Sequence, residues 1–310
     1  MSVLALSGGI GGAKLALGLY RVLPPGALTV VANTGDDFEH LGLSVSPDID
    51  TLLYTLAGLD NPEFGWGRRG ETWTFMAALE ALGGETWFKL GDGDLATHVE
   101  RTRRLAAGES LSHITDDFRR RLGIAARLLP MTDGRVRTRL RSAAGWLDFQ
   151  DYFVRLQAAP VIREIAYAGA TEARTNPEFL AALAADDLDL VVICPSNPFL
   201  SIDPILSLPG VREALRSSRA PVVAVSPIIG GKAVKGPTGK LMTELGLPVT
   251  PAAVARHYAG LLDMYIVDAA DADTVQEITI PVTSTRTMMV SLEDRDALAR
   301  AVLAAAGRGF

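Results

Sequence analysis

The chain has 310 residues and a formal net charge of −6, and 48% of its residues are hydrophobic. This composition predicts a globular protein with a sizeable core, and the acidic balance argues against a nucleic-acid partner or an anionic membrane. Its longest apolar stretches have the length of a strand rather than of a membrane span, and no export signal is visible, so we expect a cytoplasmic protein. A single cysteine, Cys194, excludes an internal disulfide.

The first expected element is a short apolar strand that runs directly into a glycine-rich turn. Residues 3–6 are followed by Ser-Gly-Gly-Ile-Gly-Gly-Ala-Lys at residues 7–14, and an apolar pattern with helical spacing follows at residues 15–20. Glycines let a phosphate approach bare backbone N–H groups, and the following helix presents the positive end of its dipole. The pattern predicts a nucleotide-binding strand–loop–helix unit; the alternative is a tight turn without a ligand.

This glycine loop differs from two well-known phosphate-binding motifs. A P-loop needs a serine or threonine after its lysine to hold Mg²⁺, but Leu15 follows Lys14 here. A dinucleotide fingerprint needs a third glycine three residues after Gly11, and that position is Lys14. The loop is therefore predicted to bind phosphates with Lys14 as a charged contact, and any metal ion must be held elsewhere.

Further along, strands alternate with helices at both ends of the chain but not in its middle. A strand is expected at residues 28–33, followed by helices at residues 71–82, 95–107 and 112–122 and by a hairpin or meander at residues 125–149 that turns at Asp133 and Gly134. Later strands are expected at residues 161–167, 188–194, 221–226 and 264–268, and later helices at residues 177–185 and 251–262. This order predicts one α/β domain over residues 1–310. We expect a doubly wound, Rossmann-like parallel sheet with a helical insertion and a small β element at about residues 52–150.

Four aspartates follow the second expected strand within fifteen residues: Asp36, Asp37, Asp48 and Asp50. In doubly wound sheets, ligands bind beyond the carboxyl ends of the strands, where such loops meet. Clustered carboxylates repel one another unless a cation lies between them, and Mg²⁺ prefers a few carboxylates together with phosphate oxygens. The cluster therefore predicts a magnesium site. The alternative is that Asp48 or Asp50 caps the helix that begins near residue 51.

Two later loops also carry polar groups directly after expected strands. Residues 194–198 read Cys-Pro-Ser-Asn-Pro, in which two prolines stiffen the loop around Ser196 and Asn197. Recognition of a base or phosphate is the favoured role, with a simple strand exit as the alternative. Residues 226–237 carry Lys232 and Lys235 among three glycines, which predicts a second anion-binding loop rather than a solvated one.

Together and in this order, the motifs resemble the 2-phospho-L-lactate transferases of deazaflavin biosynthesis. The resemblance runs from the first strand to about residue 260 and is carried by the glycine loop, Thr-Gly-Asp-Asp at 34–37, Ser-Pro-Asp-Ile-Asp-Thr at 46–51, Leu-Gly-Asp at 90–92, Pro-Ser-Asn-Pro at 195–198 and Ser-Pro-Ile-Ile-Gly at 226–230. It implies transfer of a phospho-three-carbon-acid group from a diphosphoguanosine donor to the ribityl hydroxyl of the deazaflavin Fo. GMP would leave, Mg²⁺ would be required, and the product would serve coenzyme F-420 biosynthesis. The acid can be of the lactyl, enolpyruvyl or phosphoglyceryl type.

The resemblance also implies roles for single residues. Those expected to bind the guanosine diphosphate part of the donor are Gly8, Gly9, Gly11, Gly12, Lys14, Ser196 and Asn197. Those expected to hold Mg²⁺ are Asp37, Asp48 and Asp50. Asp37 and Asp50 are also the expected catalytic residues, and Asp50 and Lys89 are expected to lie near Fo.

The sequence leaves open the identity of the transferred acid, an alternative function and the roles of two aromatic side chains. The family usually has a basic residue where this chain has Gly93, so the identity of the transferred acid is not decided. A regulatory protein of the same fold that binds a nucleotide sugar without turnover is the alternative function, although such proteins lack the Leu-Gly-Asp and Pro-Ser-Asn-Pro segments. Residues 65–67, around Trp66, are a candidate aromatic surface for the deazaflavin ring, and His40 lies between the two acidic motifs. A homodimer is left open.

Overall fold

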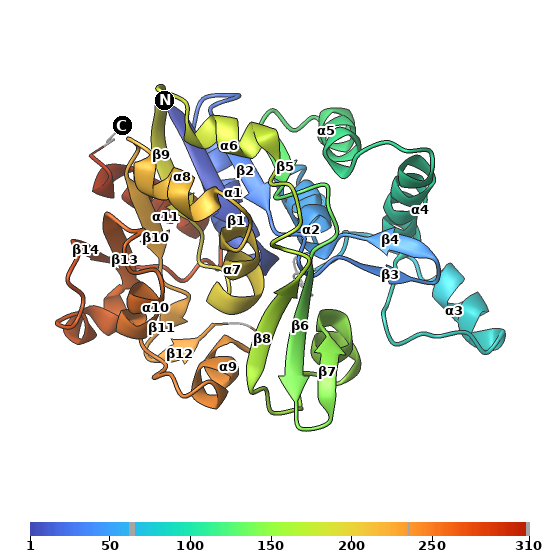
Figure 1. Ribbon diagram of the computed structural model, residues 1–310. Coiled ribbons are helices and arrows are strands. Elements are labelled where there is room, and N and C mark those ends of the chain that lie inside the picture. Colours follow the sequence, from blue (N-terminus) through green and yellow to red (C-terminus); the bar gives the residue numbers. More distant parts are fainter. Residues whose placement is uncertain (62–65, 235, 308–310) are drawn as a thin grey trace.

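A seven-stranded parallel sheet forms the centre of the computed structural model, which describes residues 1–61, 66–234 and 236–307. The strand order is β14-β13-β10-β9-β1-β2-β5, every neighbouring pair is parallel, and helices cover both faces (Figure 1). The strands are β1 (Ser2–Ser7), β2 (Leu28–Ala32), β5 (Arg127–Pro130), β9 (Leu188–Ile193), β10 (Val222–Val225), β13 (Met264–Asp268) and β14 (Val282–Thr285). The predicted doubly wound α/β fold is confirmed. Gly65 and Lys235, which belong to two predicted segments, lie outside the described residues.

The central strands are nearly continuous apolar runs because both of their faces are covered. Successive side chains of a strand point to opposite faces, so Leu4 and Leu6 of β1 lie in one core cluster while Val3 and Ala5 lie in the other. The helices that contribute to the core around Val3 are α1 (Gly9–Val22), α2 (Pro47–Leu56), α11 (Leu292–Ala305) and, through Leu111, α5 (Leu111–Arg121). Those that contribute to the core around Leu4 are α6 (Pro177–Leu183), α7 (Asp203–Leu206), α8 (Val211–Ser217), α9 (Thr238–Glu244) and α10 (Pro251–His257).

The order of the strands fixes where a ligand site can form. From β1 the chain continues to β2 on one side, and it later enters β9 on the other side of β1. The loops that leave β1 and β9 therefore run in opposite directions and open a crevice at the carboxyl ends of these strands. The glycine loop follows β1, and Pro-Ser-Asn-Pro follows β9. The predicted motifs thus meet at the switch point of the sheet.

Most of the additional elements lie between β2 and β9. They are the hairpin of β3 (Phe38–His40) and β4 (Leu43–Val45), the helices α3 (Thr74–Ala81), α4 (Asp92–Ala106) and α5 (Leu111–Arg121), and an antiparallel sheet of order β7-β6-β8. The strands of that small sheet are β6 (Arg137–Ser142), β7 (Gly145–Asp148) and β8 (Glu164–Ala168), and Figure 1 shows it as a separate green layer beside the central sheet. The remaining short elements are η1 (Asp151–Arg155), η2 (Pro198–Ile202), β11 (Ile228–Ile229), β12 (Lys232–Ala233) and η3 (Ala269–Thr274).

Two predicted strands belong to other sheets than expected. Residues 125–149 do not form one meander: β5 joins the central sheet beside β2, and Asp133 and Gly134 connect it to the small sheet instead of closing a hairpin. Asp133 accepts a hydrogen bond from the Ser112 N–H at 2.7 Å, so it serves the start of α5. The strand expected at residues 161–167 is β8, which pairs with β6 and not with the central sheet. Short apolar runs predict a strand but do not say which sheet it joins.

No helix in the described part of the chain is both long enough and apolar enough to cross a membrane.

Candidate functional site

The glycine loop is the first turn of α1. The Gly9 N–H donates to Asp48 Oδ1 at 2.5 Å, which ties the loop to the start of α2. The Gly8 N–H donates to Ser196 Oγ at 3.2 Å, and the same hydroxyl donates to the Gly8 carbonyl at 2.7 Å. Three segments that are far apart in the sequence therefore meet at this turn: the glycine loop, an aspartate motif and the loop after β9.

Close packing explains why glycines are needed here. A Cβ built on Gly8 would lie 2.5 Å from Asp48 Oδ2, and one built on Gly11 would lie 2.6 Å from the carbonyl oxygen of Pro195. Gly9 is different, because its φ of +64° favours glycine while the nearest atom to a Cβ there, Ser201 Oγ, is 3.9 Å away. Gly11 is therefore needed for contact within the protein, whereas a Cβ on Gly9 would make only an ordinary van der Waals contact with Ser201.

Lys14 and Asn197 have partners within the chain. The ammonium group of Lys14 donates to the Met289 carbonyl at 2.8 Å. Asn197 caps η2, since its Oδ1 accepts from the N–H groups of Phe199 and Leu200 at 3.0 and 3.1 Å. Its Nδ2 is buried and has no hydrogen-bond partner among the described residues, so this donor is available to a ligand.

Asn33 organises the aspartate loops, a role that the sequence analysis missed. Its Nδ2 donates to Asp48 Oδ2 at 2.9 Å and to Asp36 Oδ1 at 3.3 Å, and its Oδ1 accepts from the Gly35 N–H at 2.8 Å. The residue directly follows β2. The sequence places it at the end of the strand expected at residues 28–33 and at the start of the loop Asn-Thr-Gly-Asp-Asp, but it gives no sign that the Asn33 side chain holds the aspartates together.

Three of the four aspartates are buried and form no ion pair with a described residue. They are Asp36, Asp37 and Asp48. Burial raises the pKa of Asp37 to about 7 and that of Asp48 to about 6, and together with the neighbouring carboxylates it raises the pKa of Asp36 well above its ordinary value. Asp37 Oδ2 accepts from Ser46 Oγ at 2.8 Å, whereas Asp37 Oδ1 has no hydrogen-bond partner in the described part of the chain. This donor set fits a cation.

Asp50 has a very different environment. Arg101 of α4, whose side chain is 1% exposed, binds both carboxylate oxygens of Asp50. His98 lies beside this pair, with Nδ1 3.6 Å from Asp50 Oδ2 and Nε2 3.2 Å from Asp94 Oδ2. The Tyr54 hydroxyl donates to Asp94 Oδ1 at 2.6 Å. The charge of Asp50 is therefore compensated by a buried guanidinium.

The predicted metal ligands separate into two environments for this reason. Among the described residues, one group of three acidic or histidine side chains has ligand atoms that all lie within 4.8 Å of one another: Asp50, Asp94 and His98. A metal ion there would meet the buried guanidinium of Arg101, which makes this group a poor cation site. Asp37 and Asp48 suit Mg²⁺ better, since Mg²⁺ needs only one or two carboxylates in addition to phosphate oxygens and waters.

The Leu-Gly-Asp segment joins two inserted helices. Asp92 accepts from the N–H groups of Thr74 and Phe75 at 3.1 and 3.0 Å and so caps α3. In return, Glu71 accepts from the N–H groups of Gly93 and Asp94 at 2.6 and 2.9 Å and caps α4. A Cβ on Gly93 would lie 3.0 Å from Glu71 Oε1, so the lack of a side chain at this position accommodates the cap.

Two further predicted residues lie at the surface of the inserted region. Lys89 is exposed in the loop before α4, and Trp66 is also exposed. His40 is buried instead and packs edge-on against Trp87 and Phe88, with ring centroids 5.1 and 5.7 Å away. Burial lowers the pKa of His40. These contacts give His40 a place in an aromatic cluster of the chain itself.

The predicted second anion-binding loop uses its backbone groups internally. The N–H groups of Gly230 and Gly231 donate to the two carboxylate oxygens of Asp271 at 2.7 and 2.9 Å. A carboxylate of the chain therefore occupies the position that a ligand anion would need, while Lys232 is exposed.

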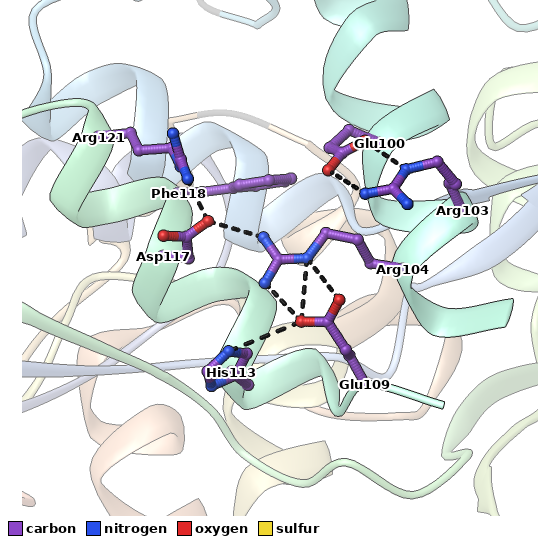
Figure 2. Close-up of a pocket in the computed structure, with 8 residues that line it drawn as sticks. All are labelled: Glu100, Arg103, Arg104, Glu109, His113, Asp117, Phe118 and Arg121. Carbon is purple, nitrogen blue, oxygen red and sulfur yellow. Dashed lines mark hydrogen bonds and ion pairs between the residues drawn. The ribbon is translucent and has the colours of Figure 1, made fainter. Parts of the chain in front are cut away.

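A hollow of about 520 Å³ lies between α4 and α5, and none of the predicted site residues lines it. Its lining consists of ion pairs (Figure 2). Arg104 binds Glu109 at 2.6 Å and Asp117 at 2.8 Å, and Asp117 also binds Arg121 at 2.9 Å. Because these charges neutralise one another, the hollow offers little to a charged ligand.

The fold and the site define a Rossmann-like α/β protein in which a glycine loop meets an aspartate cluster at the switch point of the sheet. The family model for 2-phospho-L-lactate transferase CofD matches residues 3–304, and the chain belongs to this family. A phosphoenolpyruvate transferase of Streptomyces griseus is 43% identical over 96% of this chain and 95% of its own length. One of Mycobacterium tuberculosis is 39% identical over 98% of this chain and 97% of its own length.

A solved structure shares the fold at low sequence identity. It is a member of the UPF0052 family from Bacillus halodurans, with a TM-score of 0.65, 15% identity, and coverage of 97% of this chain and 98% of its own. This likeness supports the chain's overall architecture and carries no argument about its chemistry.

Proposed function

We propose that the chain transfers a phosphoenolpyruvate-type group from a diphosphoguanosine donor to the ribityl hydroxyl of Fo, with release of GMP, in coenzyme F-420 biosynthesis. Membership of the CofD family supports a transferase, and the similarity to phosphoenolpyruvate transferases over nearly the full length favours enolpyruvyl over lactyl or phosphoglyceryl donors. The observation that carries the proposal is the 2.5 Å hydrogen bond from Gly9 to Asp48, because it joins the expected phosphate loop to the expected metal ligands.

In the proposed reaction, the glycine loop binds the donor phosphates and the aspartates hold the metal ion. Donor phosphates would meet the N–H groups of the first turn of α1 that follow Gly9, since the Gly9 N–H itself donates to Asp48. Asp37 and Asp48 would hold Mg²⁺, which when bound supplies positive charge to the diphosphate. The ribityl oxygen forms a bond to the phosphorus that carries the acid, and the bond from that phosphorus to GMP breaks with its electron pair passing to GMP. The hydroxyl proton passes to solvent. No protein nucleophile is needed, so catalysis rests on positioning and charge neutralisation.

Asp50 is proposed to orient the attacking hydroxyl. Arg101 holds its carboxylate in one position, and each carboxylate oxygen can accept more than one hydrogen bond. Lys89 is proposed to contact Fo, since it lies in the exposed loop that leads into α4.

Product analysis by mass spectrometry tests the proposal. The protein is incubated with Fo, Mg²⁺ and, in separate reactions, the lactyl, enolpyruvyl and phosphoglyceryl diphosphoguanosines, with each component omitted in turn as a control. We expect a product with the mass of Fo plus the phosphoenolpyruvate unit, together with GMP in equal amount. Absence of product with all three donors would contradict a transferase and favour a protein that binds nucleotides without turnover.

A further inference from the structure

Strand β6 carries three arginines on one face. Its residues alternate, so that Arg137, Arg139 and Arg141 share the face opposite to the buried side chains of the strand. Arg139 forms an ion pair with Asp148 at 2.9 Å, and Arg141 forms one with Glu164 at 2.7 Å. Both acidic partners come from the neighbouring strands of the small sheet. Arg137 differs, because among the described residues it forms no ion pair.

Register explains why Arg137 is left without an acidic partner. It lies opposite Ala168 of β8, and β7 pairs with β6 only from Arg139 onward. Within the described part of the chain, its side chain makes one hydrogen bond, from Nη1 to the carbonyl of Val136 at 2.7 Å. A guanidinium has five N–H donors, so most of those on Arg137 are available.

Arg137 is also next to the aspartate loop. The N–H of the following residue, Thr138, donates to the Gly35 carbonyl at 2.6 Å, which places the start of β6 against Thr-Gly-Asp-Asp. Arg137 is half-buried, and its charge acts on Asp37 and Asp36 without an ion pair to either. Burial lowers the pKa of Arg137, and Asp37 opposes this shift. A partly desolvated guanidinium with free donors therefore belongs to the residue that adjoins the aspartate loop.

We propose that Arg137 binds the carboxylate of the three-carbon acid and so helps to determine which donor is accepted. This inference rests on the proposed function. The N–H groups of the glycine loop and Mg²⁺ are assigned to the phosphates, so the acid's carboxylate is the donor anion that still lacks a cation. The acid's carboxylate would lie close to the aspartates and would be repelled by them unless a cation is nearby. Arginine suits this role better than lysine, because its planar guanidinium can form two parallel hydrogen bonds to a carboxylate.

Steady-state kinetics and nucleotide binding test this assignment. Arg137→Gln and Arg137→Lys are compared with Arg139→Gln, the matched control on the same face of the same strand. For Arg137→Gln we expect KM for the enolpyruvyl donor to rise roughly 10- to 100-fold, the range of a lost charge-assisted hydrogen-bonding contact. The affinity for GDP, which lacks the acid, should change less than about twofold. Arg137→Lys should give a smaller rise in KM, and Arg139→Gln should keep the wild-type value.

Three results would overturn the proposal: an unchanged KM in both Arg137 variants, an equal loss of GDP affinity, which would indicate a phosphate contact, or an equal rise of KM in the Arg139 control. If Arg137→Gln lowers the melting temperature, Arg137→Lys decides the matter, since it keeps the charge and loses only the fork. Failure of the proposed function gives a separate result, because the wild-type protein would then form no product.

Discussion

The aspartates and the arginines of the candidate site reach it from different parts of the chain. Asp36 and Asp37 belong to the loop that leaves β2, and Asp48 belongs to the first turn of α2, beside the glycine loop. The cations come from inserted elements: Arg101 from α4 and Arg137 from β6. The aspartates are therefore positioned by local motifs on a rigid sheet, whereas the arginines depend on how the insertion packs against it.

The two arginines also differ in what they do for the aspartates. Arg101 is buried and binds both oxygens of Asp50, so that pair is complete within the protein. Arg137 forms no ion pair with a described residue. Asp37 and Asp48 are buried and form no ion pair in the described part of the chain, although the charges of Arg137 and Arg101 act on Asp37. The charge of Asp50 is thus neutralised by Arg101 in the free protein. Asp37, Asp48 and Arg137 are proposed to be neutralised by the metal ion and the donor.

Of the changes considered, removal of metal should have the largest effect on turnover, because it acts on the region that is not neutralised within the protein. Since Asp37 and Asp48 form no ion pair with a described residue, we expect excess EDTA to abolish turnover and added Mg²⁺ to restore it. Product formation from Fo and the enolpyruvyl donor is the measurement. Full activity in EDTA would mean that the uncompensated carboxylates serve another purpose.

Removal of Asp50 tests the neutralised region. Asp50→Ala should lower kcat by orders of magnitude, and it should also reduce the free energy of unfolding by about 3–5 kcal/mol, because it leaves the buried guanidinium of Arg101 unpaired. The double variant Asp50→Ala/Arg101→Met should regain most of that stability and none of the activity. Urea denaturation and product assays on the three proteins check both parts.

The opposite pattern would separate the pair from the reaction. If Asp50→Ala is as stable as the wild type, the ion pair contributes no stability. If the double variant is active, Asp50 has no role in orienting the hydroxyl.

Sequence reasoning found the aspartate half of this site and missed most of the arginine half, for a physical reason. The glycine loop and the aspartate motifs follow neighbouring parallel strands, so their meeting at one edge follows from the fold class alone. Arg101 lies in a helix beside Arg103 and Arg104, which make ordinary ion pairs, and Arg137 shares its strand face with two paired arginines. Nothing local distinguishes the residues that face the site.

The fold shows the same division. Apolar runs predicted β1, β2, β9, β10 and β13, because strands buried on both faces have a strong signal. The assignment of β5 to the central sheet and of β8 to the small one depends on long-range pairing, which the pattern of a short run does not contain.

The pH dependence of stability in the metal-free protein tests whether the charge of Asp37 is uncompensated. Its pKa is raised from the ordinary value of 3.8 to about 7, so between these values the folded state binds more protons than the unfolded state. The wild-type protein without metal should therefore lose stability as the pH rises through this window. Asp37→Asn should be more stable than the wild type at pH 8, by on the order of 2–4 kcal/mol, and equal to it near pH 4.

Denaturation in EDTA at both pH values measures this effect. The asparagine can still accept the hydrogen bond from Ser46 Oγ, so packing is matched between the two proteins. A variant that is less stable than the wild type at pH 8 would show that the Asp37 carboxylate is compensated in the free protein after all.

The smallest expected effect separates the two roles of the glycine loop. Gly11→Ala places a Cβ 2.6 Å from the Pro195 carbonyl, a backbone atom that moves only with its loop, so we expect a loss of about 1–3 kcal/mol of stability. Gly9→Ala would make only an ordinary van der Waals contact, with Ser201 Oγ at 3.9 Å, and is penalised by its positive φ, about 1 kcal/mol. Its methyl group would instead occupy the space in front of α1 through which donor phosphates are proposed to approach.

Gly11→Ala should therefore lose more stability than Gly9→Ala, and Gly9→Ala should lose more affinity for GDP than Gly11→Ala. Thermal denaturation should show Gly11→Ala as the less stable protein, and calorimetric titration should show Gly9→Ala as the weaker binder of GDP. Affinity for Fo serves as the control, because its expected contacts, Asp50 and Lys89, lie outside the glycine loop. If Gly9→Ala binds GDP like the wild type, the first turn of α1 is a packing device between β1 and β9, and the phosphates must be bound by other donors such as the free Nδ2 of Asn197.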